Sequence, residues 1–246
     1  MGIPDISVVI LCYRAEDFAP VFVSQMKKTL EQKGLSYELV LVANYHTNAR
    51  PPDRTPELLR ELARHDPTLT VVAREKHGMM GWDMRSGLEA ASGRTVAVID
   101  GDGQIPPEDA VAVYDLINAG GFDIAKTYRT KRGDGLLRLV VSRVYNALLK
   151  LLFPRVRVRD ANSKPKIFTR DALEKLTLTS NDWFIDAEII IQASLRNLRI
   201  GEVPTVFFAN PRRASFINAR AIIGFVWHLI AYRAQTLWQE RSRLPR

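Results

Sequence analysis

Four short apolar segments recur along the N-terminal part of the chain, at residues 6–12, 37–43, 69–73 and 95–99. They are rich in β-branched side chains and carry little charge, which is typical of strands buried on both faces of a parallel sheet. Between them lie helical patterns at 18–33, 55–65 and 79–91. This alternation predicts an α/β fold, a mostly parallel sheet flanked by helices, whose ligands gather at the carboxyl ends of the strands.

Two further segments have the pattern of apolar helices. In 136–153, the polar residues Arg138, Ser142, Asn146 and Lys150 recur every four positions, which predicts one narrow polar stripe on an apolar helix. Both a core helix with a solvated edge and a helix that touches lipid fit this pattern.

The second segment, 219–238, has an uninterrupted apolar core of about ten residues, whereas about 20 are needed to span a bilayer. We therefore expect this helix to lie on a membrane surface and not to cross it. The predicted organisation is one α/β domain over 1–217 and an amphipathic helical appendage over 218–246.

Composition narrows the class of protein. The chain has 246 residues, of which 46% are hydrophobic and 25% charged, so it has enough apolar residues for a folded globular core and is not a disordered chain. The formal net charge of +8 indicates an anionic partner, which is a nucleic acid, a phosphorylated small molecule or a lipid surface. The single cysteine excludes an intramolecular disulfide, and the N-terminus reaches a strand pattern without a secretion signal, so we expect a cytoplasmic protein.

The stretch VIDGDGQIPPED places two carboxylates at the end of a buried strand. Asp100 and Asp102 flank a glycine, so both side chains can converge on one hard cation, and Gln104 can add a neutral oxygen. Mg²⁺ or Mn²⁺ held there would bridge the protein to a diphosphate. A plain polar turn is the alternative. A calcium-binding EF-hand is excluded because Ile105 and Val111 stand where its loop needs glycine and glutamate.

This stretch resembles the strand-end D-x-D-x-Q-x-P-P-E element of glycosyltransferase family 2, and in particular of its polyprenyl-phosphate sugar transferases. The resemblance implies a glycosyltransferase A-type, Rossmann-like fold and inversion at the anomeric carbon. It also implies that Asp100, Asp102 and Gln104 hold a divalent metal against the diphosphate of a nucleotide sugar.

Later segments carry the resemblance further, to about residue 217. YRTKRGDGLLRLVVSRVYNALLKLL is similar to the acceptor segment of the family. It implies that Arg129 and Arg138 bind the lipid phosphate and the donor phosphates, with Arg132 nearby. Arginine suits this task because its planar fork donates two hydrogen bonds to phosphate oxygens.

Two more elements match in part. DANSKPKIFTR resembles the D-x-x-S-G-F-[RK]-x-[FY]-x-R element at Asp160, Ser163, Lys166, Phe168 and Arg170. GEVPTVFFANPRRASF resembles the E-V-P segment and its basic loop. There, Arg213 and Ser215 are predicted to close over the donor diphosphate.

The departures from the family pattern fall where the donor base is expected. The first strand ends Leu11-Cys12-Tyr13-Arg14-Ala15 in place of P-x-Y-N-E, and the second ends Val42-Ala43-Asn44 in place of V-D-D. Leu11, Tyr13 and Asn44 are the predicted donor-binding residues, because an asparagine amide both donates to and accepts from a base edge. Asn48 is an alternative to Asn44.

The resulting hypothesis is a metal-dependent, inverting enzyme that moves a sugar from a nucleotide diphosphate sugar to a polyprenyl phosphate, peripherally on the cytoplasmic face of a membrane. A first alternative is a soluble hydroxyl acceptor, for which Asp186 or Glu188 is the candidate base. A second is a non-catalytic relative that binds nucleotide sugars. Nucleic-acid binding is disfavoured by the acidic strand end and by the lack of a recognisable nucleic-acid module.

Overall fold

The computed structural model describes residues 2–132, 136–209 and 219–242. Seven strands form one mixed sheet in the order β3-β2-β1-β4-β6-β5-β7. The strands are β1 (Ile6–Leu11), β2 (Tyr37–Val42), β3 (Leu69–Val72), β4 (Thr95–Asp100), β5 (Ile124–Arg132), β6 (Lys166–Thr169) and β7 (Ile200–Phe207). The four strands predicted from the apolar runs are confirmed.

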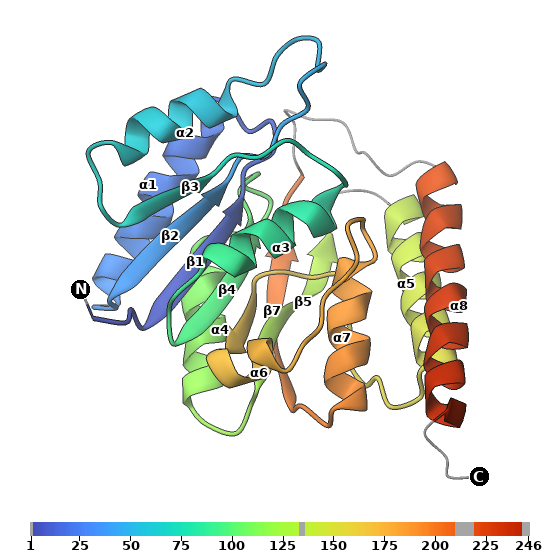
Figure 1. Ribbon diagram of the computed structural model, residues 1–246. Helices are drawn as coiled ribbons and strands as arrows, with labels where there is room; N and C mark the ends of the chain where they lie inside the picture. The colour runs from blue at the N-terminus through green and yellow to red at the C-terminus, as the bar shows by residue number, and fades with distance from the viewer. Residues whose placement is uncertain (1, 133–135, 210–218, 243–246) are drawn as a thin grey trace.

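The helices flank this sheet in two layers (Figure 1). They are α1 (Phe18–Gln32), α2 (Thr55–Ala63), α3 (Met80–Ala90), α4 (Glu108–Asn118), α5 (Leu136–Leu152), α6 (Arg170–Glu174), α7 (Ile185–Leu195) and α8 (Ala219–Ser242). One apolar core lies between the sheet and α1, α2 and α4, and a second lies between the sheet and α3, α5, α7 and α8. The predicted α/β architecture is therefore confirmed.

The direction of the strands fixes the position of the chemistry. β1 pairs in parallel with β2 and with β4, so their carboxyl ends meet at one edge of the sheet. Leu11, at the end of β1, is in register with Asp100, at the end of β4. β6 runs antiparallel to both of its neighbours and therefore brings the segment before it, 160–165, to the same edge.

The helices α5 and α8 lie side by side at one edge of the molecule (Figure 1). On α8, Leu229 is buried, and the ring of Tyr232 packs against Phe184, with 5.3 Å between centroids. The predicted boundary between residues 217 and 218 lies outside the described residues. The division into two domains therefore stays a prediction.

The polar residues of α5 do not form a solvated stripe. Asn146 is buried, and its amide accepts a hydrogen bond from the backbone N–H of Ala161 at 2.9 Å. Lys150 is exposed, and so are the apolar side chains of Val140, Val144 and Leu151, at 55%, 62% and 75%. Of the two interpretations of this pattern, a core helix with a solvated polar edge fits only in part: Lys150 is solvated, whereas Asn146 supports the 160–165 loop and apolar side chains face outward.

Candidate active site

The two strand-end carboxylates lie at the edge that the sequence predicts. Asp100 is the last residue of β4, and the backbone N–H of Gly101 donates to the carbonyl oxygen of Leu11 at 3.0 Å. A Cβ on Gly101 would lie 2.8 Å from Ile10, so glycine is required for the chain to turn here against β1. Asp102 then accepts a hydrogen bond from the backbone N–H of Gln104 at 3.0 Å, which closes the turn.

Gln104 joins this turn to the end of β7. Its side-chain nitrogen donates to the carbonyl oxygen of Phe208 at 2.9 Å, and the backbone N–H of Phe208 donates to the carbonyl oxygen of Gln104 at 2.9 Å. The amide oxygen is thus the side-chain atom of Gln104 that can serve as a metal ligand. Its predicted ligand role is compatible with this geometry but is not tested by it.

The donor set suits a hard divalent cation. Asp100 and Asp102 supply carboxylate oxygens, and Mg²⁺ and Mn²⁺ favour oxygen ligands, with one or two carboxylates usually completed by phosphates and water. Among the described residues, no three His, Cys, Asp or Glu side chains are grouped to hold a metal ion.

A lysine that the sequence analysis missed lies against Asp100. The ammonium of Lys164 is 3.4 Å from Oδ2 of Asp100 and 3.1 Å from Oδ2 of Asp186. Its side chain is only 3% exposed, whereas that of Asp100 is 31% exposed. Although burial lowers it, the carboxylates of Asp100 and Asp186 raise the pKa of Lys164 to about 12, so this group is charged at neutral pH.

The available signal for this lysine was a departure from the family pattern. Lys164 and Pro165 stand in SKPK where the D-x-x-S-G-F element carries glycine and phenylalanine. A lysine in place of a glycine indicates that this segment differs from the family pattern in charge. The sequence does not show which residue the lysine contacts, because that depends on the antiparallel placement of β6 beside β4.

Arg129 is held by a carboxylate of that same segment. Its Nε and Nη2 donate to Asp160 at 2.6 and 2.8 Å, and its guanidinium lies 5.3 Å from the ring centroid of Phe207. Although burial raises it, the hydrogen bonds and charge of Arg129 hold the pKa of Asp160 well below its usual range. Two N–H groups of this arginine are therefore committed within the protein.

The other predicted phosphate ligands are placed only by their elements or not at all. Arg132 is the last residue of β5, and Arg138 lies in the first turn of α5. Arg213 and Ser215 lie outside the described residues. Their roles stay predictions.

Asp186 and Glu188, the candidate bases for a hydroxyl acceptor, are both buried on α7. Asp186 contacts the ammonium groups of Lys164 and Lys166, and although burial raises it, these charges lower its pKa. Glu188 accepts hydrogen bonds from the backbone N–H groups of Thr179 and Ser180. Both carboxylates are thus engaged with groups of the protein in this structure, and their role as a base stays a prediction.

On the donor-base side, Asn44 is fully buried and its amide is satisfied within the protein. It donates to Asp83 at 3.0 Å and to Ser86 at 2.9 Å, and it accepts from the backbone N–H of Arg74 at 2.9 Å. Direct recognition of a base by Asn44 is not supported by this placement. Asn44 instead supports Asp83 at the start of α3.

Tyr13 is the predicted donor-binding residue with an aromatic face. The ammonium of Lys76 lies 4.2 Å from its ring centroid, and the same ammonium forms a buried ion pair with Asp83. Burial lowers the pKa of Lys76 and raises that of Asp83, while the opposite charge of each partner opposes these shifts. The sequence analysis missed this pair, which links Tyr13 after β1 to α3.

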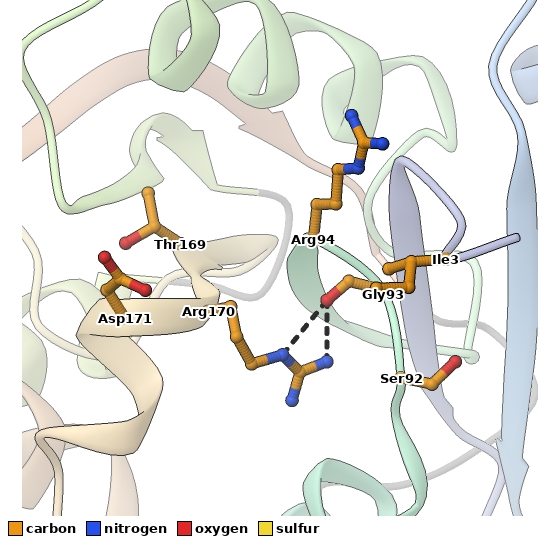
Figure 2. Close-up of a pocket in the computed structure, with 7 residues that line it drawn as sticks. All are labelled: Ile3, Ser92, Gly93, Arg94, Thr169, Arg170 and Asp171. Atoms are coloured by element: carbon orange, nitrogen blue, oxygen red, sulfur yellow. Dashed lines mark hydrogen bonds between the residues drawn. The ribbon is translucent and has the colours of Figure 1, made fainter.

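A pocket elsewhere on the surface does not belong to this edge. It has a volume of about 540 Å³ and is lined by residues near the first residue of β4 and the last residue of β6 (Figure 2). Arg170 projects there, and its guanidinium donates to the carbonyl oxygens of Gly93 and Ala91. Arg170, which matches the family element, therefore ties the chain before β4 to the start of α6 and lies at the opposite end of β4 from Asp100.

The sheet order and the acidic strand end define a glycosyltransferase A-type protein. Residues 7–177 match the model of glycosyl transferase family 2, and the chain belongs to that family. It is 31% identical over 151 residues to an undecaprenyl-phosphate 4-deoxy-4-formamido-L-arabinose transferase from Pectobacterium carotovorum, covering 60% of this chain and 44% of that protein. It is 26% identical over 230 residues to a dolichol-phosphate mannosyltransferase from Pyrococcus furiosus, covering 91% of this chain and 62% of that protein. The chain thus spans less than two thirds of both relatives.

A solved structure supports the fold independently. Glucosyl-3-phosphoglycerate synthase from Mycobacterium tuberculosis, in complex with Mn²⁺, uridine diphosphate and glucosyl-3-phosphoglycerate, superposes with a TM-score of 0.72 over 94% of this chain and 80% of that one. The two are 20% identical, so this likeness shows the fold alone. The predicted resemblance to polyprenyl-phosphate sugar transferases is confirmed by the two relatives.

Proposed function

We propose that the protein transfers a sugar from a nucleotide diphosphate sugar to a polyprenyl phosphate, with inversion at the anomeric carbon. The observation that carries this proposal is the pair Asp100 and Asp102 at the carboxyl end of β4, in a chain whose relatives act on undecaprenyl phosphate and dolichol phosphate. An oxygen of the acceptor phosphate attacks the anomeric carbon, and the bond from that carbon to the nucleoside diphosphate breaks.

Asp100, Asp102 and the amide oxygen of Gln104 would hold Mg²⁺ or Mn²⁺. When bound, the metal supplies positive charge to the departing diphosphate. The protein's own part is to fix the two carboxylates on a glycine turn and to place Leu11 and Tyr13 beside the donor. Arg213 and Ser215 are proposed to cover the donor diphosphate.

Arg129, Arg132 and Arg138 are the proposed ligands of the acceptor phosphate. For Arg129, the ion pair with Asp160 fixes the direction of the guanidinium beside the end of β7. A phosphate acceptor is already anionic near neutral pH and needs no general base. The burial of Asp186 and Glu188 is consistent with this, and it weighs against the soluble hydroxyl acceptor.

Contact with a membrane surface is supported by the outward faces of α5 and α8. On α8, Trp227, Ile230 and Trp238 are 66%, 48% and 71% exposed, at spacings that place them along one side of a helix. Arg143 and Lys150 are exposed on α5 and would face anionic headgroups. Within the described part of the chain, no helix has the length and apolar character needed to cross a bilayer. We therefore propose peripheral binding, on the cytoplasmic face, with no nucleic-acid partner.

The test is a donor panel of nucleotide diphosphate sugars, incubated with Mn²⁺ or Mg²⁺ and extracted polyprenyl phosphates, and scored for glycolipid. Asp102→Asn should lower product formation by about a hundredfold or more, since it removes a carboxylate ligand of the metal that would stabilise the departing diphosphate. Asp115→Asn is the matched control, because Asp115 is an exposed carboxylate on α4 that pairs with Lys33.

Product undiminished by Asp102→Asn would refute the metal assignment. Binding of a nucleoside diphosphate in calorimetry with Mn²⁺, without transfer to any acceptor, would favour the non-catalytic alternative. Transfer to a soluble hydroxyl acceptor, with no transfer to polyprenyl phosphate, would favour the soluble-acceptor alternative.

A further inference from the structure

The Asp100 carboxylate already has a counter-ion within the protein. Lys164 approaches it to 3.4 Å, from a position where the ammonium is also 3.1 Å from Asp186 and 3.3 Å from the sulfur of Met80. The peptide Lys164–Pro165 precedes β6 directly, so the lysine is carried by the sheet itself. Lys164 is therefore a fixed positive charge, and its position relative to Asp100 is set by the fold.

Asp100 adds negative charge beside a carboxylate that two lysines share. Lys164 and Lys166 both contact Asp186, and although burial lowers the pKa of Lys166 to about 7, Lys164 stays charged. Asp100 supplies the second negative charge. A buried ammonium without a counter-ion is costly, which gives Asp100 a role in the folded protein before any ligand arrives.

A divalent cation on Asp100 would then lie a few ångströms from the Lys164 ammonium. Like charges at this distance, in a partly buried setting, repel by an amount that changes an affinity roughly tenfold. The same ammonium attracts a diphosphate, which carries the opposite charge. One fixed cation thus acts in opposite directions on the two ligands of this edge.

We propose that Lys164 is a positioning residue of the diphosphate site, which shares Asp100 with the divalent metal, weakens metal binding to the free protein and strengthens binding of the diphosphate. This inference rests on the proposed function, because it assumes that the edge at Asp100 receives a metal and a diphosphate. Its consequence is that the metal binds well only together with the donor.

The test measures two separate affinities by calorimetry on the full chain: Mn²⁺ alone, and inorganic pyrophosphate alone with a chelator present. Lys164→Met should bind Mn²⁺ roughly tenfold more tightly and pyrophosphate roughly tenfold more weakly than the unmodified protein. A merely structural role would weaken both. Lys164→Arg, which keeps the charge, should restore the pyrophosphate affinity to within about threefold.

Lys166→Met is the matched control. It removes an ammonium from the other side of the same carboxylate, and its contacts are with Asp186 and the carbonyl oxygen of Ser163. Its Mn²⁺ affinity should change less than that of Lys164→Met, because the charge that it removes is partial near neutral pH and lies beyond ion-pair distance of Asp100. If Lys164→Met does not fold, Lys164→Gln removes the charge while keeping a hydrogen-bond donor and is measured in the same way.

Unchanged or weaker Mn²⁺ binding by the neutral variant would overturn the inference, and so would an equal effect of Lys166→Met. These failures are distinct from failure of the proposed function. If the unmodified protein binds a nucleoside diphosphate with Mn²⁺ but the neutral variant shows no shift, only the role of Lys164 fails. If the unmodified protein does not bind a nucleoside diphosphate even in the presence of Mn²⁺, both fail.

Discussion

Arg129 and Asp160 form a bidentate ion pair, with Nε donating to Oδ2 at 2.6 Å and Nη2 donating to Oδ1 at 2.8 Å. Both side chains are only 10% exposed. The pair joins β5 to the segment before β6, two stretches separated by α5 in the chain. It is thus a structural contact between the proposed acceptor segment and the edge that carries Asp100.

Arg129→Lys should destabilise the fold because a lysine cannot make both hydrogen bonds at once. We expect the free energy of unfolding to fall by about 1–3 kcal/mol, the range for a lost hydrogen bond to a charged group. Urea unfolding measures this. The control is Arg64→Lys, since Arg64 pairs with Glu61 on an exposed surface and should change the stability by less than about 1 kcal/mol. If both variants lose the same free energy of unfolding, the pair with Asp160 stabilises the fold no more than an exposed ion pair does.

The same ion pair predicts how the free energy of unfolding depends on pH. The pKa of Asp160 lies below the ordinary value of about 4, so the folded state holds its proton less tightly than the unfolded state. The stabilisation is therefore fully present above about pH 4 and is lost as the pH falls below that value towards the folded-state pKa.

Asp160→Asn removes this titration. The unmodified protein should be more stable than Asp160→Asn at pH 6, and the difference should shrink between about pH 4 and pH 3. Chemical unfolding at each pH gives the comparison. A difference that stays constant across this range would contradict the assignment, because a group that does not titrate differently in the two states adds no slope.

Local patterns were enough to predict the sheet and the acidic strand end. Strands β1 to β4 are continuous apolar runs, and the position of Asp100 follows from the end of one of them. What the sequence did not predict is set by contacts distant in the chain. Lys164 meets Asp100 because β6 inserts antiparallel beside β4, and 64 positions separate the two residues.

Two residue assignments show the same limit. Asn44 follows β2 and is predicted to bind the donor base, but its amide nitrogen donates to two side chains of α3 and its oxygen accepts from the backbone N–H of Arg74. Asn146 is predicted to lie on a polar stripe, but its amide oxygen accepts a hydrogen bond from the backbone N–H of Ala161. In each case the residue type indicates a hydrogen-bonding role, and only tertiary packing decides whether the partner is a ligand, water or the backbone.

Asp186→Asn separates a structural carboxylate from a catalytic one. The change leaves Lys164 and Lys166 without the carboxylate that they share, so we expect the unfolding free energy to fall by about 3 kcal/mol or more. Thermal and urea unfolding provide the measurement, with Asp115→Asn as the exposed control. If Asp186→Asn is instead as stable as the unmodified protein and yet loses transfer to a hydroxyl acceptor, the residue is a general base and the soluble-acceptor alternative is favoured.

The outward faces of α5 and α8 predict binding to anionic vesicles. Val144 and Trp227 are 62% and 66% exposed, which is unusual for large apolar side chains and is explained if lipid covers them. Trp227→Ser should weaken binding to phosphatidylglycerol vesicles by about tenfold, the effect of losing one large apolar side chain from the interface. Val144→Ser should weaken vesicle binding less than Trp227→Ser does. Added salt should weaken binding of every variant, because salt screens the attraction of Arg143 and Lys150 to the anionic headgroups.

Val21→Ser provides the control for vesicle binding, since Val21 is 48% exposed on α1, in the layer on the other face of the sheet. Sedimentation with vesicles at low and high salt measures all three; equal effects of the α1 and α8 variants, or no binding by the unmodified protein at low salt, would rule out this face as the membrane contact.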